Sequence, residues 1–436
     1  MKNILIAIRS IFKKGRHNVM KIVSLGIGLA VGLVLIAKVY FEQSYDDFYP
    51  DRDRVYQVWA KYQQNGGELK DYPQTSGGIA PTMQQQIPEI ETVTRYTSFG
   101  DWTFTMTDTK MKYSGRCIIA DSCFFDILPR PMLIGNAKEV LSTPMYVLIS
   151  SRIAKNIGGD VIGKNFTVDN SPGRTMTIGG VFEEVPENSH SRYDVIVSMA
   201  SAGRFMWEGS PTNMLGNDRY ISYVKLHKGV NPLALEEQVR TFVNSYFPPE
   251  EQQKVGLSID FSFHKLDNLH KELPQVKRMT WILSLLAFAL IFTAVMNYIL
   301  IVISSIVNRS KEVAVHKCYG ASENNIHGMM FGEALVHIVL SLILALLLIL
   351  AFRGTVEELL ATSLDSLLLS NGSLVLLGIC ILVFFVSGFM PGSLYARIPV
   401  ASAFRNYREN KRIWKKALLL VQFVATGFLV TMLVFV

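Results

Sequence analysis

Residues 22–41 read IVSLGIGLAVGLVLIAKVYF, an apolar run that contains one charged residue, Lys38. A run of about 20 apolar residues is long enough to cross the hydrocarbon core of a bilayer as a helix. Comparable runs occupy residues 280–307, 329–352, 373–397 and 417–436. The sequence therefore predicts an α-helical transmembrane bundle of four spans, with a fifth at its C-terminal end.

A long polar insert, residues 42–279, separates the first apolar run from the second. It is large enough for one or two folded domains, and its turns and β-branched runs predict a mixed α+β module. A stretch rich in Gly, Ser and Met at residues 199–217 indicates a division into two subdomains. Strands are expected at residues 53–62, 116–120, 166–169, 175–182 and 220–226, and helices at residues 79–86, 151–156 and 232–247.

The composition agrees with this organisation. Hydrophobic residues make up 49% of the chain and the mean hydropathy is +0.25, which is too apolar for a soluble protein with so large a polar insert unless the apolar residues are concentrated in spans. The net charge of +7 is concentrated beside the apolar runs. It therefore does not indicate a nucleic-acid partner.

The charges that flank the apolar runs predict the orientation in the membrane. Residues 1–21 and 398–416 are rich in Lys and Arg, whereas the charged residues of 353–372 are Glu357, Glu358 and Asp365 against Arg353. Short loops rich in Lys and Arg stay in the cytoplasm. We therefore expect residues 1–21, 308–328 and 398–416 inside, and residues 42–279 and 353–372 outside.

The N-terminal segment has two further features. Residues 1–21 interleave apolar and basic side chains, which predicts an amphipathic helix on the inner membrane surface. Residues 22–41 are longer than the apolar core of a signal peptide and are followed by no small-residue cleavage site. We expect a retained span.

Motifs for catalysis or metal binding do not stand out. Residues 158–164, GGDVIGK, have the spacing of a phosphate-binding loop, but Asn165 stands where Ser or Thr would hold Mg²⁺ and a strand-like run follows. A turn is the better interpretation. His264 and His270 flank Asp267 and Glu272 too loosely to favour a metal site. We predict a non-enzymatic chain without cofactor or metal.

Four cysteines are too few for a disulfide scaffold. The expected topology places Cys117 and Cys123 outside, where they could form a bridge or, equally, serve as small apolar core residues. Cys318 in a cytoplasmic loop and Cys380 in a span are expected to be unpaired.

Two features inside the predicted spans concern helix packing. Gly26, Gly28 and Gly32 place small residues on one helical face, which either allows a neighbouring helix to approach closely or reflects the general tolerance of membrane helices for Gly. Glu333 is costly in lipid, so we expect it to face the bundle or the cytoplasmic helix before it.

Five stretches stand out by their order along the chain: EQSYDDF (42–48), DRVYQV (53–58), ADSCFFD (120–126), PENSH (186–190) and RSKEVAVHKCYGA (309–321). In this order they resemble the MacB/FtsX-like permease family of ABC transporters, in the large form of Bacteroidetes-type bacteria. The last stretch, expected in the cytoplasm, carries His316 where the family usually has Arg, and Pro391 resembles the close of the family's last span.

The resemblance implies a membrane subunit without ATPase activity that works with a separate cytoplasmic ABC ATPase. A short helix between two spans would pass the closure of that ATPase to the bundle; an ordinary membrane-surface helix is the alternative. The family implies a relay to the outer domain that drives export or extraction of an antibiotic, peptide or lipoprotein. The implied coupling residues are Arg309, Lys311, Glu312, Val313, His316, Lys317, Gly320 and Ala321.

Other functions stay open at this stage. The chain could instead be a regulatory membrane scaffold that activates an extracytoplasmic cell-wall hydrolase, or a membrane-anchored receptor. The resemblance implies a bacterial inner-membrane location with a periplasmic domain, and as partners the ATPase, an outer-membrane or periplasmic protein, and a second permease half or a second copy. Residues 411–416 and the apolar run after them repeat the design of the first span, so we expect a second half in a longer tandem permease.

Overall fold

The computed structural model describes residues 17–169, 171–369, 372–396, 416–417, 419–424, 426–427 and 431. Within this part the chain forms two compact units. The helical unit contains the residues up to Gln43 and from Pro274 onwards, and the inserted domain is Ser44–Leu273. Most of the predicted segments 1–21, 398–416 and 417–436 lies outside the described residues.

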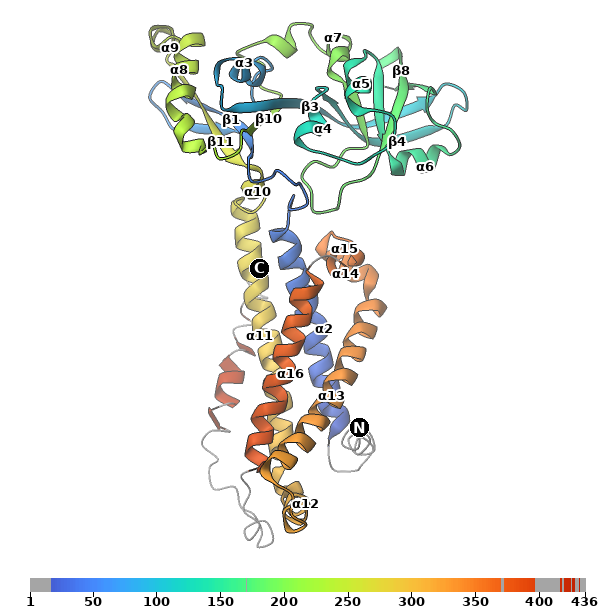
Figure 1. The fold of residues 1–436 in the computed structure, drawn as a ribbon, viewed down its shortest axis with the longest axis vertical. Coiled ribbons are helices and arrows are strands. Elements are labelled where there is room, and N and C mark those ends of the chain that lie inside the picture. The colour runs from blue at the N-terminus through green and yellow to red at the C-terminus, as the bar shows by residue number, and fades with distance from the viewer. Residues whose placement is uncertain are drawn as a thin grey trace. The chain divides into compact units, whose positions relative to one another are not determined.

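Long apolar helices make up the helical unit: α2 (Asn18–Gln43), α11 (Pro274–Ser304), α13 (Glu323–Ala351) and α16 (Ser373–Ala396). In the described part, α2, α11 and α13 are long and apolar enough to cross a membrane, and the apolar portion Ser373–Gly388 of α16 is shorter. Helix α2 packs against α11 and α13, and α13 also packs against α16 (Figure 1).

Shorter helices connect these long ones. Helix α12 (Ile306–Cys318) follows α11 after a turn at Ser305, so α11 ends before the limit of 307 expected for the second span. Helices α14 (Arg353–Leu360) and α15 (Leu364–Leu368) link α13 to α16. The helix expected between the second and third spans is thus present as α12, and the connection 353–372, expected only as a short loop, also contains two helices.

One mixed sheet organises the inserted domain, and its strands within the described part number 11. Neighbours are antiparallel except for β4 beside β9 and β6 beside β8. In sheet order, the strands are β11 (Leu257–Lys265), β1 (Val55–Gln64), β10 (Ile221–Leu226), β3 (Ile90–Met106), β4 (Lys112–Ala120), β9 (Val195–Ser198), β6 (Tyr146–Ser150), β8 (Ser171–Phe182) and β5 (Met132–Ile134), with β2 (Lys70–Tyr72) on β1 and β7 (Asn165–Val168) joining β3 to β8.

Short helices complete the predicted mixed α+β module. The glycine-rich stretch before β7 is a turn, as expected, with Gly158, Gly159 and Gly163 at positive φ. The helices are α3 (Ile79–Gln86), α4 (Phe124–Ile127), α5 (Ala137–Ser142), α6 (Ser151–Ile157), α7 (Ala202–Phe205), α8 (Glu236–Tyr246), α9 (Pro249–Val255) and α10 (Leu266–Leu269), with the 3₁₀ turns η1 (Met199–Ser201), η2 (Ser210–Thr212) and η3 (Pro232–Leu235).

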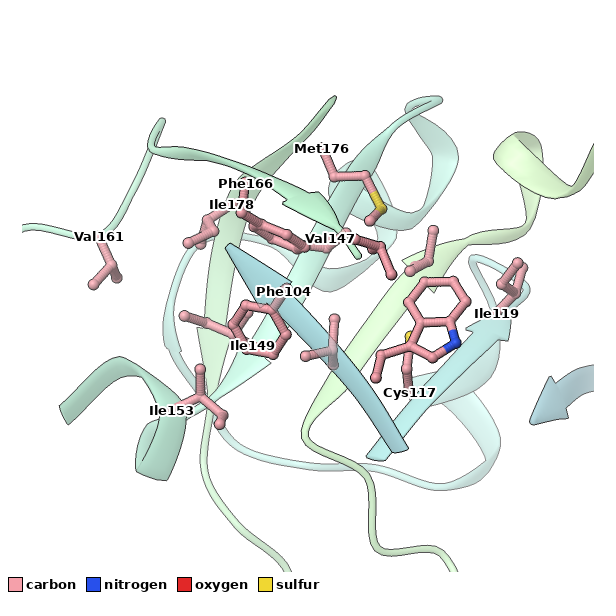
Figure 2. Close-up of a cluster of buried hydrophobic side chains, with 14 of the residues drawn as sticks. Phe104, Cys117, Ile119, Val147, Ile149, Ile153, Val161, Phe166, Met176 and Ile178 are labelled. Atoms are coloured by element: carbon pink, nitrogen blue, oxygen red, sulfur yellow. The ribbon is translucent and has the colours of Figure 1, made fainter. Parts of the chain in front are cut away.

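The middle of the sheet is buried on both faces. In β4, Cys117 and Ile119 enter the core cluster drawn in Figure 2, whereas Ile118 enters another cluster on the opposite face. Alternate residues of a strand point to opposite faces, so a strand covered on both sides reads as a continuous apolar run. Cys117 and Cys123 are both free, and Cys117 fills the role of a small core residue.

The predicted subdomain break at residues 199–217 is wrong. The sheet continues from β10 to β3, and the stretch packs against the end of β10 instead of separating two bodies. Ser210 Oγ lies 2.8 Å from Tyr220 Oη, and the Arg95 guanidinium donates to the carbonyl of Pro211. The Gly, Ser and Met residues of 199–217 therefore belong to an irregular segment that packs on the domain and does not act as a linker.

Candidate functional site

Helix α12 is amphipathic, with a buried and an exposed face. Ser310, Val313 and Ala314 are buried, whereas Lys311 and His316 are exposed. The exposed face also carries Val315 and Tyr319, whose exposed fractions are 43% and 88%. Residues four apart lie on the same face of a helix, so these two apolar side chains are adjacent. An exposed apolar pair that includes a tyrosine and is rimmed by polar side chains is a typical contact for a protein partner.

The end of α12 is fixed by backbone geometry. Gly320 has φ +85°, its amide donates to the Lys317 carbonyl at 3.0 Å, and the Ala321 amide donates to the His316 carbonyl at 3.0 Å. These two bonds form a Schellman motif, which ends a helix with a residue in the left-handed region. The Ser322 hydroxyl then accepts from the Asn325 amide at the start of α13. Helices α12 and α13 are therefore joined by a tight, well-defined turn.

The structure separates the residues implied by the resemblance into three groups. Lys311, His316 and Gly320 are exposed, and Glu312, Lys317 and Ala321 are half-buried. Val313 is buried against the bundle and is not available to a partner. Arg309 lies in α12 and Pro391 in α16, but both side chains lie outside the described part.

Sequence reasoning missed Val315 and Tyr319. The available signal was their position on α12, because both lie on the side opposite Val313. The buried face of this helix is formed by other residues, which are small or branched. An apolar side chain that lies outside the core and is exposed is a candidate contact for a partner protein.

Glycines on α2 allow close packing of the bundle. A Cβ added at Gly28 would lie 2.2 Å from Ala294 Cβ, and one at Gly32 would lie 2.4 Å from Ile291 Cγ1. Both therefore face α11 in a GxxxG arrangement. Gly26 faces α13 instead, because its added Cβ would lie 2.9 Å from Leu344 Cδ2. The expectation that all three share one contact face is thus wrong for Gly26.

Glu333 faces the interior of the bundle, as expected. It and His337, one turn later on α13, line a small cavity with Tyr298 of α11 and Ser387 of α16. Tyr298 Oη lies 3.2 Å from His337 Nδ1, and His337 is 1% exposed. Ionisable residues inside a membrane bundle are rare because they are costly there. These polar side chains come from α11, α13 and α16 and meet around one small cavity inside the bundle.

A second polar contact in the helical unit lies at the C-terminal end of α2. Lys38 Nζ is 2.7 Å from Glu42 Oε1 and donates to Thr362 Oγ1 at 2.7 Å. All three residues are buried. Because Thr362 lies between α14 and α15, this contact ties that connection to α2.

Two of the stretches that carry the resemblance meet in the inserted domain. Asp46 is fully buried with φ +60°, and its carboxylate accepts from Ser189 Oγ at 2.8 Å and lies 2.6 Å from His190 Nδ1. His190 Nε2 lies 2.5 Å from Tyr223 Oη. The contact fixes the segment that follows α2, which is a structural role.

Known proteins are similar to both units. Residues 284–400 match the family model of the FtsX-like permease C-terminal region. A domain of a candidate permease from Porphyromonas gingivalis is 33% identical, over 50% of this chain and 91% of that domain, with a TM-score of 0.46. No curated protein sequence is significantly similar.

Two further solved structures are more distant. The periplasmic region of MacB from Actinobacillus actinomycetemcomitans is 14% identical, over 50% of this chain and 92% of that chain, with a TM-score of 0.35. The extracellular domain of the noncanonic ABC-type transporter YknZ from Gram-positive bacteria is 12% identical, over 47% of this chain and 98% of that chain, with a TM-score of 0.33.

The match of residues 284–400 to the FtsX-like permease model, in a unit whose helices are long and apolar enough to cross a membrane, indicates an ABC-type permease of the FtsX-like class. On the family match and the identity to the Porphyromonas domain, the chain belongs to the MacB/FtsX-like permease family.

Proposed function

We propose that this permease subunit relays motion from a separate cytoplasmic ATPase, docked on α12, to its periplasmic domain. The relay drives export or extraction of a substrate such as an antibiotic, peptide or lipoprotein. The chain itself holds no catalytic site in this scheme, and two permease halves or two copies assemble in the inner membrane.

The exposed face of α12 carries this proposal. Val315 and Tyr319 supply the apolar contact and Lys311 and His316 the polar rim, while the buried face connects the same helix to the bundle. The Schellman turn at Gly320 makes the helix rigid relative to α13. A push on α12 would therefore move α13 and, through the Gly26 contact, α2.

Two direct chain connections would pass the motion from the helices to the inserted domain. Helix α2 ends at Gln43 and the inserted domain begins at Ser44; the domain ends at Leu273 and α11 begins at Pro274. Because Gly28 and Gly32 pack α2 tightly on α11, both chain connections to the domain would move together. In this proposal α16 is the fourth span and residues 417–436 are the fifth.

A photo-crosslinking amino acid at Tyr319 tests the docking surface in intact cells. We expect it to capture a protein that hydrolyses ATP. The matched control is Leu359 on α14, which is 78% exposed but lies on the other short connection. Capture of an ATPase at both positions, or at neither, would contradict docking on α12.

Substitution then measures the contact. Val315→Ala with Tyr319→Ala should weaken binding of the purified ATPase by about tenfold or more, because an aromatic anchor at an interface typically contributes over 1 kcal/mol. Leu359→Ala should leave the affinity unchanged. If the chain instead co-purified with a cell-wall hydrolase bound to the periplasmic domain, and no ATP-dependent substrate release was found, the regulatory-scaffold function would replace transport.

A further inference from the structure

A pocket in the inserted domain has an unusual excess of arginine. Its volume is about 450 Å³, and it opens beside β4, α6 and the segment between β8 and β9. Four arginines line it against three acidic residues, Asp101, Glu184 and Asp194. The arginines are Arg116, Arg130, Arg152 and Arg192.

Within the part of the chain that the structure describes, one of these four arginines forms an ion pair in the pocket. Arg152 pairs with Glu184 at 3.4 Å and with Asp194 at 2.5 Å. Asp194 is further occupied by the Arg116 amide, which donates to it at 2.9 Å. Among the ion pairs of the described residues, none includes the guanidinium of Arg116, Arg130 or Arg192. Asp101 lies opposite Arg116 in the sheet register, so the lining keeps an excess of one positive charge, with Arg116 and Arg192 exposed.

Arg130 places a charge at the buried end of the pocket. It is 5% exposed, and its Nη2 donates to Ser191 Oγ at 3.1 Å. Its Nε has no acceptor among the described residues. The guanidinium otherwise lies near aromatic rings, 5.3 Å from the Phe182 centroid and 5.8 Å from that of Tyr193. A buried cation without a paired anion is costly, so it favours an anionic ligand.

We propose that this pocket is a binding site for an oxyanion, a phosphate or carboxylate group. The planar guanidinium of Arg130 supplies paired donors whose geometry matches such groups, and Arg116 and Arg192 attract them to the mouth. Val185 and Tyr193 in the lining offer an apolar surface for whatever the anionic group is attached to. The group can come from a lipid headgroup or from a free ion. The inference does not depend on the ATPase or on the direction of transport.

Titration calorimetry on the full chain in uncharged detergent tests the site at constant ionic strength. The probes are inorganic phosphate, acetate and dihexanoyl phosphatidic acid. Saturable binding of phosphate or acetate supports a free-ion source, and binding of the phosphatidic acid alone supports a lipid headgroup. Absence of saturable binding by all three overturns the proposal.

Two variants and a control locate the bound anion. Arg130→Met should weaken binding by at least about tenfold, because a charge-assisted bidentate contact is lost. Arg116→Gln with Arg192→Gln changes only exposed side chains, so it should keep the fold and still weaken binding. Arg204→Gln, at an exposed arginine on α7 outside the pocket, should bind as the wild type does. Affinities within twofold of the wild type in both pocket variants would overturn the assignment.

Discussion

At the scale of single residues, the close packing of α2 on α11 depends on the absence of a side chain at Gly28. Gly28 has no room for a Cβ, because the Cβ of Ala294 would lie 2.2 Å away. The atom in the way is the Cβ of alanine, which has no side-chain torsion that could move it aside. Gly28→Ala should therefore force α2 and α11 apart and destabilise the helical unit by about 1–3 kcal/mol, as overpacking does. Unfolding of the full chain in mixed micelles would measure the loss.

The matched control and a rescue come from the same bundle. Gly378 on α16 has open space around it, so Gly378→Ala should cost little. Combining Gly28→Ala with Ala294→Gly moves the methyl group to the opposite helix and should recover most of the stability. A Gly28→Ala variant as stable as the wild type would show that the helices do not meet at this glycine.

A histidine in the inserted domain predicts a dependence on pH. Burial lowers the pKa of His264, whose ring stacks on Trp59, below its usual value of about 6.5. Below pH 6.5 the unfolded chain then binds more protons than the folded one, so the stability contributed by the neutral ring is lost as pH falls through this region. His264→Gln should reduce the slope of unfolding free energy against pH between pH 7 and 5. The reduction corresponds to at most one bound proton. An unchanged slope would contradict this assignment.

At the scale of elements, the turn between α12 and α13 depends on the left-handed backbone conformation of Gly320. Gly320 has φ +85°, a region that costs other residues about 1–2 kcal/mol. Gly320→Ala should therefore destabilise the turn by about 1 kcal/mol and reduce stimulation of the partner ATPase more than it reduces overall stability. Gly354→Ala, in a helix and with open space, is the control and should be neutral or slightly stabilising. Equal effects of the two substitutions on ATPase stimulation would argue against a rigid relay.

The sequence predicted some elements better than others, for physical reasons. The long apolar runs and strands with clear turn signals, such as β1, β8 and β10, lie close to their expected positions. Strands β6 and β9 were missed because four or five apolar residues buried on both faces have no period that distinguishes strand from helix. Strand β3 was missed because a bulge near Gly100 interrupts its alternation.

The candidate site was predicted in part for similar reasons. The helical run ending at Gly320 follows from local sequence, since glycine alone adopts the required conformation without cost. The exposure of Val315 and Tyr319 depends on which face of α12 packs on the bundle, which is a tertiary property. The polar cluster at Glu333 likewise needs Tyr298 from another helix, and the Arg130 pocket assembles residues from five separate segments.

At the scale of the whole molecule, the proposed function requires the inserted domain and α12 to lie on opposite sides of the membrane. The basic flanks of the apolar runs predict this arrangement. The chain offers a natural probe, because Cys318 at the end of α12 is exposed whereas Cys117 is buried. A second probe, Asn65→Cys, lies at an exposed turn after β1 in the domain.

Labelling with a membrane-impermeant maleimide tests the topology with these two cysteines, each in a chain from which the other cysteines have been replaced by serine. In spheroplasts, Asn65→Cys should react at once, whereas Cys318 should react only after the membrane is permeabilised. Asn324→Cys, exposed at the start of α13, is an independent probe of the inner side and should behave as Cys318 does. A chain in which Cys318 reacts before permeabilisation and Asn65→Cys does not would have the opposite orientation. No cytoplasmic ATPase could then reach Tyr319, and the proposed relay through α12 would fail with it.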